Sequence, residues 1–234
     1  MKAIVTGGLG FIGSHLVEAL LNNGAKVHIL DNAATNRLEN SDAVIHRVDI
    51  RRDNAKQIIV NVKPDIIFHL AAQADVSESI LNPKYDADVN IIGTINVLQA
   101  SIEADVKKII FASTSAVYGQ LQKELISEDD SAIPVSYYGL SKLTAESYIR
   151  LFGSLHGITY SILRYGNVYG PRQIAKGEGG VIAVFLDRVK KQRPVTIHGD
   201  GEQTRDFIFV KDVVRANLAA IDTGHDETIH VSTG

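Results

Sequence analysis

The chain of 234 residues is 45% hydrophobic, and its 24 Lys and Arg nearly balance its 27 Asp and Glu, for a net charge of −3. This composition excludes intrinsic disorder and argues against a nucleic-acid partner. The absence of cysteine excludes disulfides, thiolate metal sites and a cysteine nucleophile. No apolar run approaches the ~20 residues that span a bilayer. We therefore expect a cytoplasmic protein of one to two domains with no membrane partner.

The predicted elements alternate between strand and helix along the first part of the chain. Apolar runs predict strands at 3–6, 26–30, 44–48, 65–70, 108–112 and 159–163. Amphipathic segments predict helices at 11–22, 53–62, 88–104 and 141–155. Apolar strands between amphipathic helices are typical of a parallel sheet covered on both faces. The fold class we predict is α/β, with a doubly wound parallel sheet of the Rossmann type.

The pattern changes after Arg164. Glycines cluster between residues 166 and 180, which predicts a long loop, and 181–192 then predicts a helix. Strand-like runs at 195–197 and 207–210 flank the turn at Gly199–Gly201. A helix at 211–222 and a strand at 228–231 complete the chain.

Three glycines follow the first predicted strand. Gly7, Gly10 and Gly13 have the spacing G-x-x-G-x-x-G and open the first helix. These glycines allow a tight turn, a close approach of backbone to a pyrophosphate, and close packing of helix on sheet. The free N–H groups of the helix then face the anion. An ordinary strand-to-helix turn is the alternative, but position and context favour a dinucleotide site.

Asp31 ends the second predicted strand. A carboxylate about 20 residues after the glycine motif can accept hydrogen bonds from the adenosine ribose of NAD and repel the 2′-phosphate of NADP. A surface aspartate that begins a loop is the simpler alternative. Arg37 is near enough in the sequence to keep NADP open, although Asp31 favours NAD.

Tyr138 and Lys142 have the spacing Y-x-x-x-K. On a helix these two positions share one face, and a nearby ammonium favours the phenolate form of tyrosine, which makes it a base. A packed tyrosine beside a solvated lysine is the alternative. A second polar cluster, Ser113–Ser115, directly follows an apolar strand, where ligands bind in open parallel sheets. Plain turn chemistry also favours serine and threonine there.

The motifs together resemble the extended short-chain dehydrogenase/reductase family, in its NAD-dependent nucleotide-sugar epimerase/dehydratase branch. The match covers almost the whole chain in the expected order. It is carried by TGGLGFIGS at 6–14, DN at 31–32, HLAAQADV at 69–76, NIIGTINVL at 90–98, ASTSAVYG at 112–119, YYGLSK at 137–142, RYGNVYGPRQ at 164–173 and GDGEQTRDFIFVKDVV at 199–214.

The resemblance implies a role for each matching position. The residues implied in NAD binding are Gly7, Gly10, Phe11, Ile12, Asp31, Asn32, Asp49, Ile50, Leu70, Ala71, Ala72, Gln73, Asn90, Tyr138 and Lys142. The implied catalytic residues are Thr114, Tyr138 and Lys142. Those implied in binding the UDP-sugar substrate are Thr114, Tyr138, Asn167 and Arg205.

The resemblance also implies a reaction. Tyr138 takes the proton of the sugar 4-hydroxyl while C4 gives a hydride to NAD, and the 4-keto sugar turns over before the hydride returns. Dehydratases of the family carry Asp-Glu after the catalytic hydroxyl, and decarboxylases carry Glu at the second position. Ser115 and Ala116 stand there in this chain. This favours a 4-epimerase that interconverts UDP-glucose and UDP-galactose over a decarboxylase or dehydratase.

Other functions stay open at this point. A UDP-glucuronate 4-epimerase is the nearest competitor, and a catalytically idle, NAD-binding regulatory protein belongs to another class. The eight histidines lack the spacing of metal ligands, and His69 lies in an apolar strand as a predicted core residue, so no metal site is expected.

The resemblance finally implies how the chain is divided into domains and how it assembles. We expect a Rossmann domain over residues 1–165. Residues 166–234 are expected to form part of a smaller sugar-binding lobe, with elements that return to the first domain and with the C-terminal part of the lobe absent. The predicted helices at 88–104 and 141–155 correspond to the pair that family members use for a homodimer.

Overall fold

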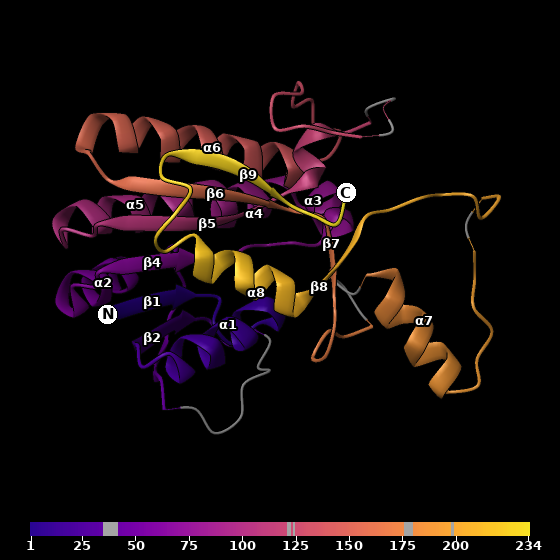
Figure 1. Cartoon of the computed structure of the whole chain (residues 1–234), viewed down its shortest axis with the longest axis horizontal. Helices are drawn as coiled ribbons and strands as arrows, with labels where there is room; N and C mark the ends of the chain where they lie inside the picture. The colour runs from indigo at the N-terminus through magenta and orange to yellow at the C-terminus, as the bar shows by residue number, and fades with distance from the viewer. Residues whose placement is uncertain (35–41, 121–122, 124, 176–179, 198) are drawn as a thin grey trace.

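Seven strands form one parallel sheet in the part of the chain that the structure describes. The structure, a computed structural model, describes residues 1–34, 42–120, 123, 125–175, 180–197 and 199–234. The strands lie in the order β3-β2-β1-β4-β5-β6-β9. Their bounds are β1 Lys2–Thr6, β2 Lys26–Asp31, β3 Val44–Arg47, β4 Ile66–His69, β5 Lys108–Thr114, β6 Thr159–Tyr165 and β9 Glu227–Val231. The doubly wound α/β fold predicted from the sequence is thus confirmed (Figure 1).

Helices cover both faces of the sheet because the side chains of each strand alternate between them. Ala3 and Val5 of β1 pack in one core, with α1 (Phe11–Asn22) and α8 (Val210–Ala219). Ile4, between them, packs in the other core, with α2 (Asp53–Val62), α5 (Gly93–Glu103) and α6 (Tyr137–His156). β1 is therefore apolar on both sides, as its uninterrupted hydrophobic run predicts.

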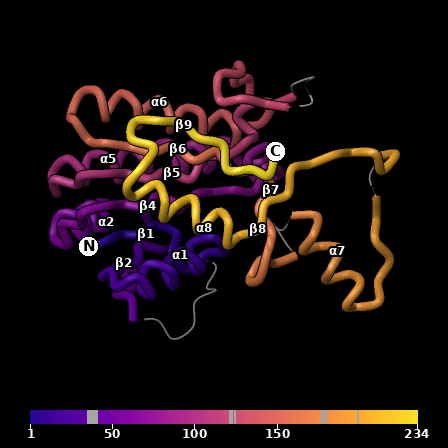
Figure 2. Tube along the Cα trace, viewed as in Figure 1, coloured from indigo at the N-terminus to yellow at the C-terminus, as the bar shows by residue number. Residues whose placement is uncertain are grey.

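A second, two-stranded sheet and one helix lie beside the main sheet. β7 (Asn167–Tyr169) pairs in parallel with β8 (Phe207–Phe209). α7 (Val181–Lys190) has no buried residue. Figure 2 shows the trace of α7 to the right of the layered sheet and helices, away from them. The α8 helix and β9 strand return from this region to the main sheet, where β9 pairs with β6.

Short helices at the carboxyl edge of the sheet were not predicted. α3 (Val76–Leu81), α4 (Pro83–Ala87) and the π-helix η1 (Asp88–Ile92) connect β4 to α5. A 3₁₀ turn, η2 (Ser115–Tyr118), follows β5. The predicted helix at 88–104 is therefore part π-helix. Such π segments occur often at functional sites, because the wider turn redirects side chains.

Two further predictions from the sequence are wrong. Residues 195–197 form no strand, since the described residues offer them no pairing partner. The helix predicted to begin at Ser141 begins at Tyr137, because the Ser136 hydroxyl accepts a hydrogen bond from the Gly139 amide and caps it. The stretch predicted as a long loop also contains β7.

No helix in the described part of the chain is long and apolar enough to cross a membrane.

Candidate active site

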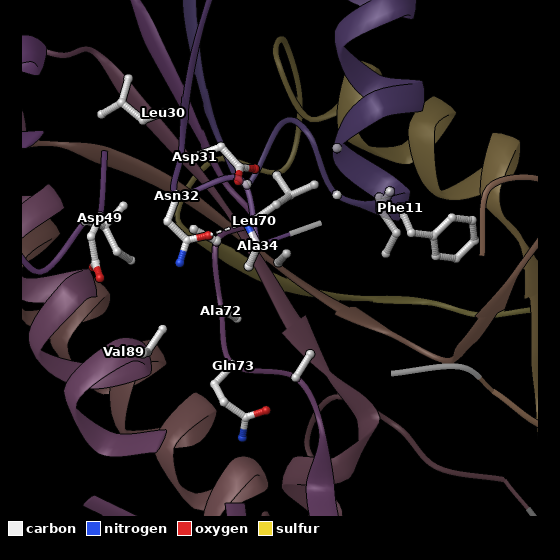
Figure 3. Close-up of a pocket in the computed structure, with 18 of the residues that line it drawn as sticks. Phe11, Leu30, Asp31, Asn32, Ala34, Asp49, Leu70, Ala72, Gln73 and Val89 are labelled. Carbon is white, nitrogen blue, oxygen red and sulfur yellow. Dashed lines mark hydrogen bonds between the residues drawn. The ribbon is translucent and has the colours of Figure 1, made fainter. Parts of the chain in front are cut away.

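A cleft of about 390 Å³ runs along the carboxyl edge of the sheet. Its walls come from the glycine turn, the ends of β2, β4 and β5, and the first turns of α6. Figure 3 shows Phe11, Asp31, Asn32, Asp49 and Gln73 around its open space. Of the residues predicted from the sequence, it brings together Gly7, Gly10, Phe11, Ile12, Asp31, Asn32, Asp49, Ile50, Leu70, Ala71, Ala72, Gln73, Tyr138 and Lys142.

The glycine turn is tight enough to require glycine. Gly7 has a φ of +71°, and a Cβ there would lie 2.8 Å from the Ala71 nitrogen. A Cβ on Gly13 would lie 2.2 Å from the Gly7 carbonyl oxygen. The first helical amide with a backbone acceptor is that of Ser14, and α1 has no side-chain cap. The preceding amides of α1 are thus free within the described residues, as a bound pyrophosphate requires.

Asp31 lies at the tip of β2 and is 8% exposed. Burial raises the pKa of its carboxyl, while hydrogen bonds from the amides of Ala33 (2.7 Å) and Leu9 (3.0 Å) lower it. The Leu9 bond ties the carboxylate directly to the glycine turn. The adjacent Asn32 accepts from the Ala34 amide at 3.0 Å. Arg37, which kept NADP open, lies outside the described residues.

At the far end of the cleft, Asp49 is held by Arg51. The Arg51 Nε donates to both carboxylate oxygens at 3.0 Å, and these bonds lower the pKa of Asp49. The Arg51 guanidinium also lies 5.3 Å from the ring centroid of Tyr85, a cleft residue that was not predicted. The Asp49 carboxylate is therefore ionised and bonded to Arg51.

Asn90 supports the cleft from behind and does not line it. Its Oδ1 accepts from the Gln73 amide at 2.9 Å, and its Nδ2 donates to the Gln73 carbonyl at 2.9 Å. The same Nδ2 donates to the Ser141 hydroxyl at 3.0 Å. Asn90 thus joins the end of β4 to α6, and the π-helix around it turns its side chain inward.

Tyr138 and Lys142 lie one turn apart on α6, and both line the cleft. Lys142 is 3% exposed, and its Nζ lies 4.5 Å above the ring centroid of Phe111. Burial lowers the pKa of Lys142 to about 8. No described residue accepts a hydrogen bond from this ammonium. Because Lys142 lines the cleft, its ammonium can donate to the hydroxyls of a ribose bound there.

The three hydroxyls at the end of β5, of Ser113, Thr114 and Ser115, differ in what they already bind, and of the three only Ser113 lines the cleft. Ser113 donates to the buried Glu146 carboxylate at 2.6 Å, and Ser115 is exposed. Thr114 accepts a hydrogen bond from the Ala116 amide at 3.1 Å, and no described residue accepts its proton. Of the three, Thr114 is therefore the partly buried hydroxyl that is free to donate to a ligand.

Two buried carboxylates near Lys142 were missed from the sequence. Asp86 is 1% exposed and Glu146 is fully buried. Each lies four residues from a predicted site residue, Asn90 or Lys142, so helical spacing was a usable signal.

Asn167 and Arg205 do not reach the cleft. The Asn167 Nδ2 donates to the Asp206 carbonyl at 3.0 Å, and the Arg205 guanidinium donates to the Thr204 carbonyl at 2.6 Å. Both side chains are exposed, at or next to the small β7-β8 sheet.

His69 is a core residue, as predicted. It is 1% exposed, and its ring nitrogens bind the hydroxyls of Thr6 (2.7 Å) and Thr94 (2.9 Å). Burial lowers its pKa to about 3, so the ring is neutral. The described residues include no group of three or more side chains able to hold a metal ion.

Comparison with known proteins agrees with this geometry. The family model described as "NAD dependent epimerase/dehydratase family" matches residues 3–232. A putative UDP-glucose 4-epimerase of Methanocaldococcus jannaschii is 45% identical, over 99% of this chain and 76% of its own length. A UDP-N-acetyl-alpha-D-glucosaminuronate decarboxylase of Bacillus cytotoxicus is 36% identical, over 94% of this chain and 71% of its own length.

Solved structures are also similar over the whole chain. The UDP-glucose 4-epimerase of Thermotoga maritima with UDP-glucose matches with a TM-score of 0.96 and 42% identity, over 100% of this chain and 77% of its own. The Thermus thermophilus UDP-glucose 4-epimerase in complex with NAD matches with a TM-score of 0.95 and 39% identity, over 100% of this chain and 78% of its own.

Proposed function

Because this chain belongs to the NAD-dependent epimerase/dehydratase family, we propose that it inverts C4 of a UDP-sugar and interconverts UDP-glucose and UDP-galactose. The observation that supports the proposal is the pair of Tyr138 and Lys142, which lines a cleft together with the glycine turn. The end of β5, whose Ser113 also lines the cleft, carries Thr114.

NAD, when bound, supplies an acceptor for the hydride of C4 and gives it back. The chain's own residues hold the cofactor. The α1 amides face the pyrophosphate, and Asp31 accepts from the adenosine ribose. Lys142 donates to the nicotinamide ribose, an acceptor that none of the described residues supplies. Asp49, Ile50 and the segment Leu70–Gln73 form the remaining walls.

Tyr138 acts on the sugar. As a phenolate it takes the proton of the 4-hydroxyl, and it returns a proton to the same oxygen after the ring has turned over. The Lys142 ammonium favours the phenolate by its charge. Thr114 donates a hydrogen bond to the sugar oxygen in both its hydroxyl and its carbonyl form.

Ser115 and Ala116 support epimerisation over the related reactions. Removal of water from C5 and C6 needs an acid and a base, and neither side chain after Thr114 carries a carboxylate. Some relatives are decarboxylases, so decarboxylation is an alternative reaction. A UDP-glucuronate 4-epimerase is the second candidate. In the proposed sugar-binding part at 166–234, Asn167 is assigned to the substrate and Arg205 to its nucleotide diphosphate. A substrate would draw their exposed side chains from their present backbone contacts.

The experiment is incubation of the chain with UDP-galactose and NAD, followed by NMR of the sugar anomeric protons. We expect UDP-glucose to form, and we expect Tyr138→Phe to lose about 10²-fold or more in rate while NAD binding is retained. Ser115→Ala, which removes an exposed hydroxyl beside the site, is the matched control and keeps its rate. Turnover of UDP-glucuronate without turnover of UDP-galactose would assign the second candidate.

We also propose a homodimer through α5 and α6. A row of apolar side chains is exposed on α6, with Leu140 49%, Tyr148 37%, Leu151 54% and Leu155 66% exposed. Their spacing places them on one face of α6, and α6 shares a buried core with α5. Sedimentation should give a dimer, and Leu151→Glu should give monomers. A wild-type monomer at micromolar concentration would contradict the proposal.

A further inference from the structure

The wall of the cleft includes an aromatic residue, Tyr85, that none of the sequence motifs contains. Tyr85 lies on the short helix α4, and 41% of it is exposed. Aromatic side chains are common in the walls of ligand clefts, where they contact the flat or apolar parts of a ligand. Tyr85 is therefore a candidate contact for whatever part of the dinucleotide lies beside it.

The ring of Tyr85 lies against a cation that is itself held in place. The central carbon of the Arg51 guanidinium lies over the ring, 5.3 Å from its centroid. The Asp49 carboxylate accepts hydrogen bonds from the Arg51 Nε at 3.0 Å, from its Nη2 at 2.5 Å and from its amide at 2.9 Å. A guanidinium over an aromatic face is attracted to it. Arg51 therefore covers one face of the ring and holds Tyr85 against the cleft wall.

The order of the strands indicates which part of a dinucleotide lies beside Tyr85. Asp31, at the tip of β2, is assigned to the adenosine ribose, and β3 is the next strand outward from β2. Asp49 and Arg51 follow the end of β3, whereas Tyr138 lies on α6, which packs on β5 and β6. Since the base lies beyond its ribose, the Arg51–Tyr85 pair is at the adenine end of the cleft.

The surroundings of the pair suit a flat base. Ile50, which is 4% exposed, and Val89 also line the cleft. Figure 3 shows Val89 on the same side of the open space as Asp49. The Asn96 Nδ2 donates to the Ile50 carbonyl at 3.2 Å, so the loop that carries Arg51 is anchored to α5. This end of the cleft thus offers apolar and aromatic surface on a fixed support.

We propose that the adenine ring of the dinucleotide stacks on Tyr85, with Arg51 behind it. Arg51 covers one face of the tyrosine ring, and the base takes the other face. Stacking depends on the flat aromatic surface of a base and not on its hydrogen-bonding groups. The inference adds a residue to the cofactor site, and it rests on the proposed function only in taking NAD as the dinucleotide.

The first test uses fluorescence. The chain contains no tryptophan, so Tyr85→Trp places a single fluorescent reporter at this position. ADP, which carries the adenine without the nicotinamide, should quench this fluorescence to saturation, and pyrophosphate, which has no base, should not. Leu81→Trp on α3 is the matched control, because Leu81 is 75% exposed and lies outside the cleft wall. No quenching in Tyr85→Trp, or equal quenching in both variants, would overturn the inference.

The second test is calorimetric titration of the full chain. Tyr85→Ala should weaken the binding of NAD and of ADP about tenfold each, and Tyr85→Phe, which keeps the ring, should restore both affinities. Nicotinamide mononucleotide, which lacks the adenine, should bind equally to all three proteins. Unchanged NAD affinity in Tyr85→Ala, or an equal loss for nicotinamide mononucleotide, would overturn the inference. Neither test needs turnover, so a chain that binds NAD in this pattern but does not convert UDP-galactose would defeat only the proposed function.

Discussion

The polar side chains around the cleft are buried, whereas those of the segment between β6 and β8 are exposed. Around the cleft, Lys142, Glu146 and Asn90 are at most 3% exposed and are fixed by packing or by hydrogen bonds from several elements. In the segment, Asn167 and Arg205 are exposed, and α7 has no buried residue. The polar side chains around the cleft are thus fixed by this chain's own contacts, whereas a ligand can still rearrange the exposed side chains of the segment.

The largest expected contrast is between two ion pairs. Arg164→Met leaves the Glu146 carboxylate buried with less compensation and should cost about 3–5 kcal/mol of unfolding free energy. Lys191→Met removes the exposed pair with Asp187 on α7, at 2.8 Å, and should cost about 0.3–0.5 kcal/mol. Urea unfolding measures both. Equal losses of unfolding free energy in the two variants would contradict the contrast between the cleft and the segment that contains α7.

The stabilisation by the Arg164–Glu146 pair should depend on pH. Burial would raise the pKa of Glu146, but the bonds from Arg164 and Ser113 outweigh it and bring the pKa below its ordinary value of 4.5. The stabilisation is therefore complete above that value and is lost as pH falls through the lowered pKa. The stability difference between wild type and Arg164→Met should be constant near neutral pH and shrink below 4.5. A difference that grew in acid would refute this sign.

Apolar side chains give the next contrast. Leu16 of α1 is fully buried, and Leu186 of α7 is 65% exposed. Leu16→Ala should cost about 2–5 kcal/mol because it leaves a cavity. Leu186→Ala should stay within about 0.5 kcal/mol. Thermal unfolding compares the two, and a large loss in Leu186→Ala would mean that α7 is packed in solution.

Glycine substitution tests the turn itself. Gly13→Ala puts a Cβ 2.2 Å from the Gly7 carbonyl oxygen, so we expect a loss of about 1–3 kcal/mol and weaker NAD binding. In Gly180→Ala, at the start of α7, the new Cβ meets only the Gln173 side chain at 3.4 Å. That control should bind NAD as the wild type does. Calorimetric NAD titration of both variants measures the effect, and unchanged affinity in Gly13→Ala would exclude the pyrophosphate role of the turn.

The smallest effect concerns cofactor choice. Asp31→Ala removes the carboxylate assigned to the adenosine ribose and should weaken NAD binding about tenfold, or ~1.4 kcal/mol. It should also relax the discrimination against NADP, since the charge that repels a 2′-phosphate is gone. Fluorescence titration with both dinucleotides measures the ratio of affinities. A ratio equal to that of the wild type would remove Asp31 from this role.

The sequence predicts best what local rules determine. The bounds of α1 and α2 follow from apolar spacing and from Gly24 and Pro64 just beyond their ends. The start of α6 was missed because its capping residue, Ser136, precedes a run with no clear apolar period. The strand expected at 195–197 has strand-like residues but no described partner, and pairing decides whether a strand forms.

The support around the cleft depends on long-range contacts that no local pattern encodes. Ser113 and Glu146 are 33 residues apart, and Arg164 contacts the Tyr118 hydroxyl across 46 residues. Only the sheet order brings β5, β6 and α6 together to make these bonds. The sequence motifs therefore predicted many of the residues that line the cleft, but they missed Tyr85, which also lines it, and the buried Asp86 and Glu146.

The central claim, inversion at C4 with return of the same hydride, is tested most directly with UDP-galactose deuterated at C4. In ordinary water the account predicts UDP-glucose that keeps its deuterium at C4, read by NMR, and a rate that falls in Tyr138→Phe. UDP-glucose that has lost the label to solvent, or a folded and NAD-loaded chain that forms none, would contradict it.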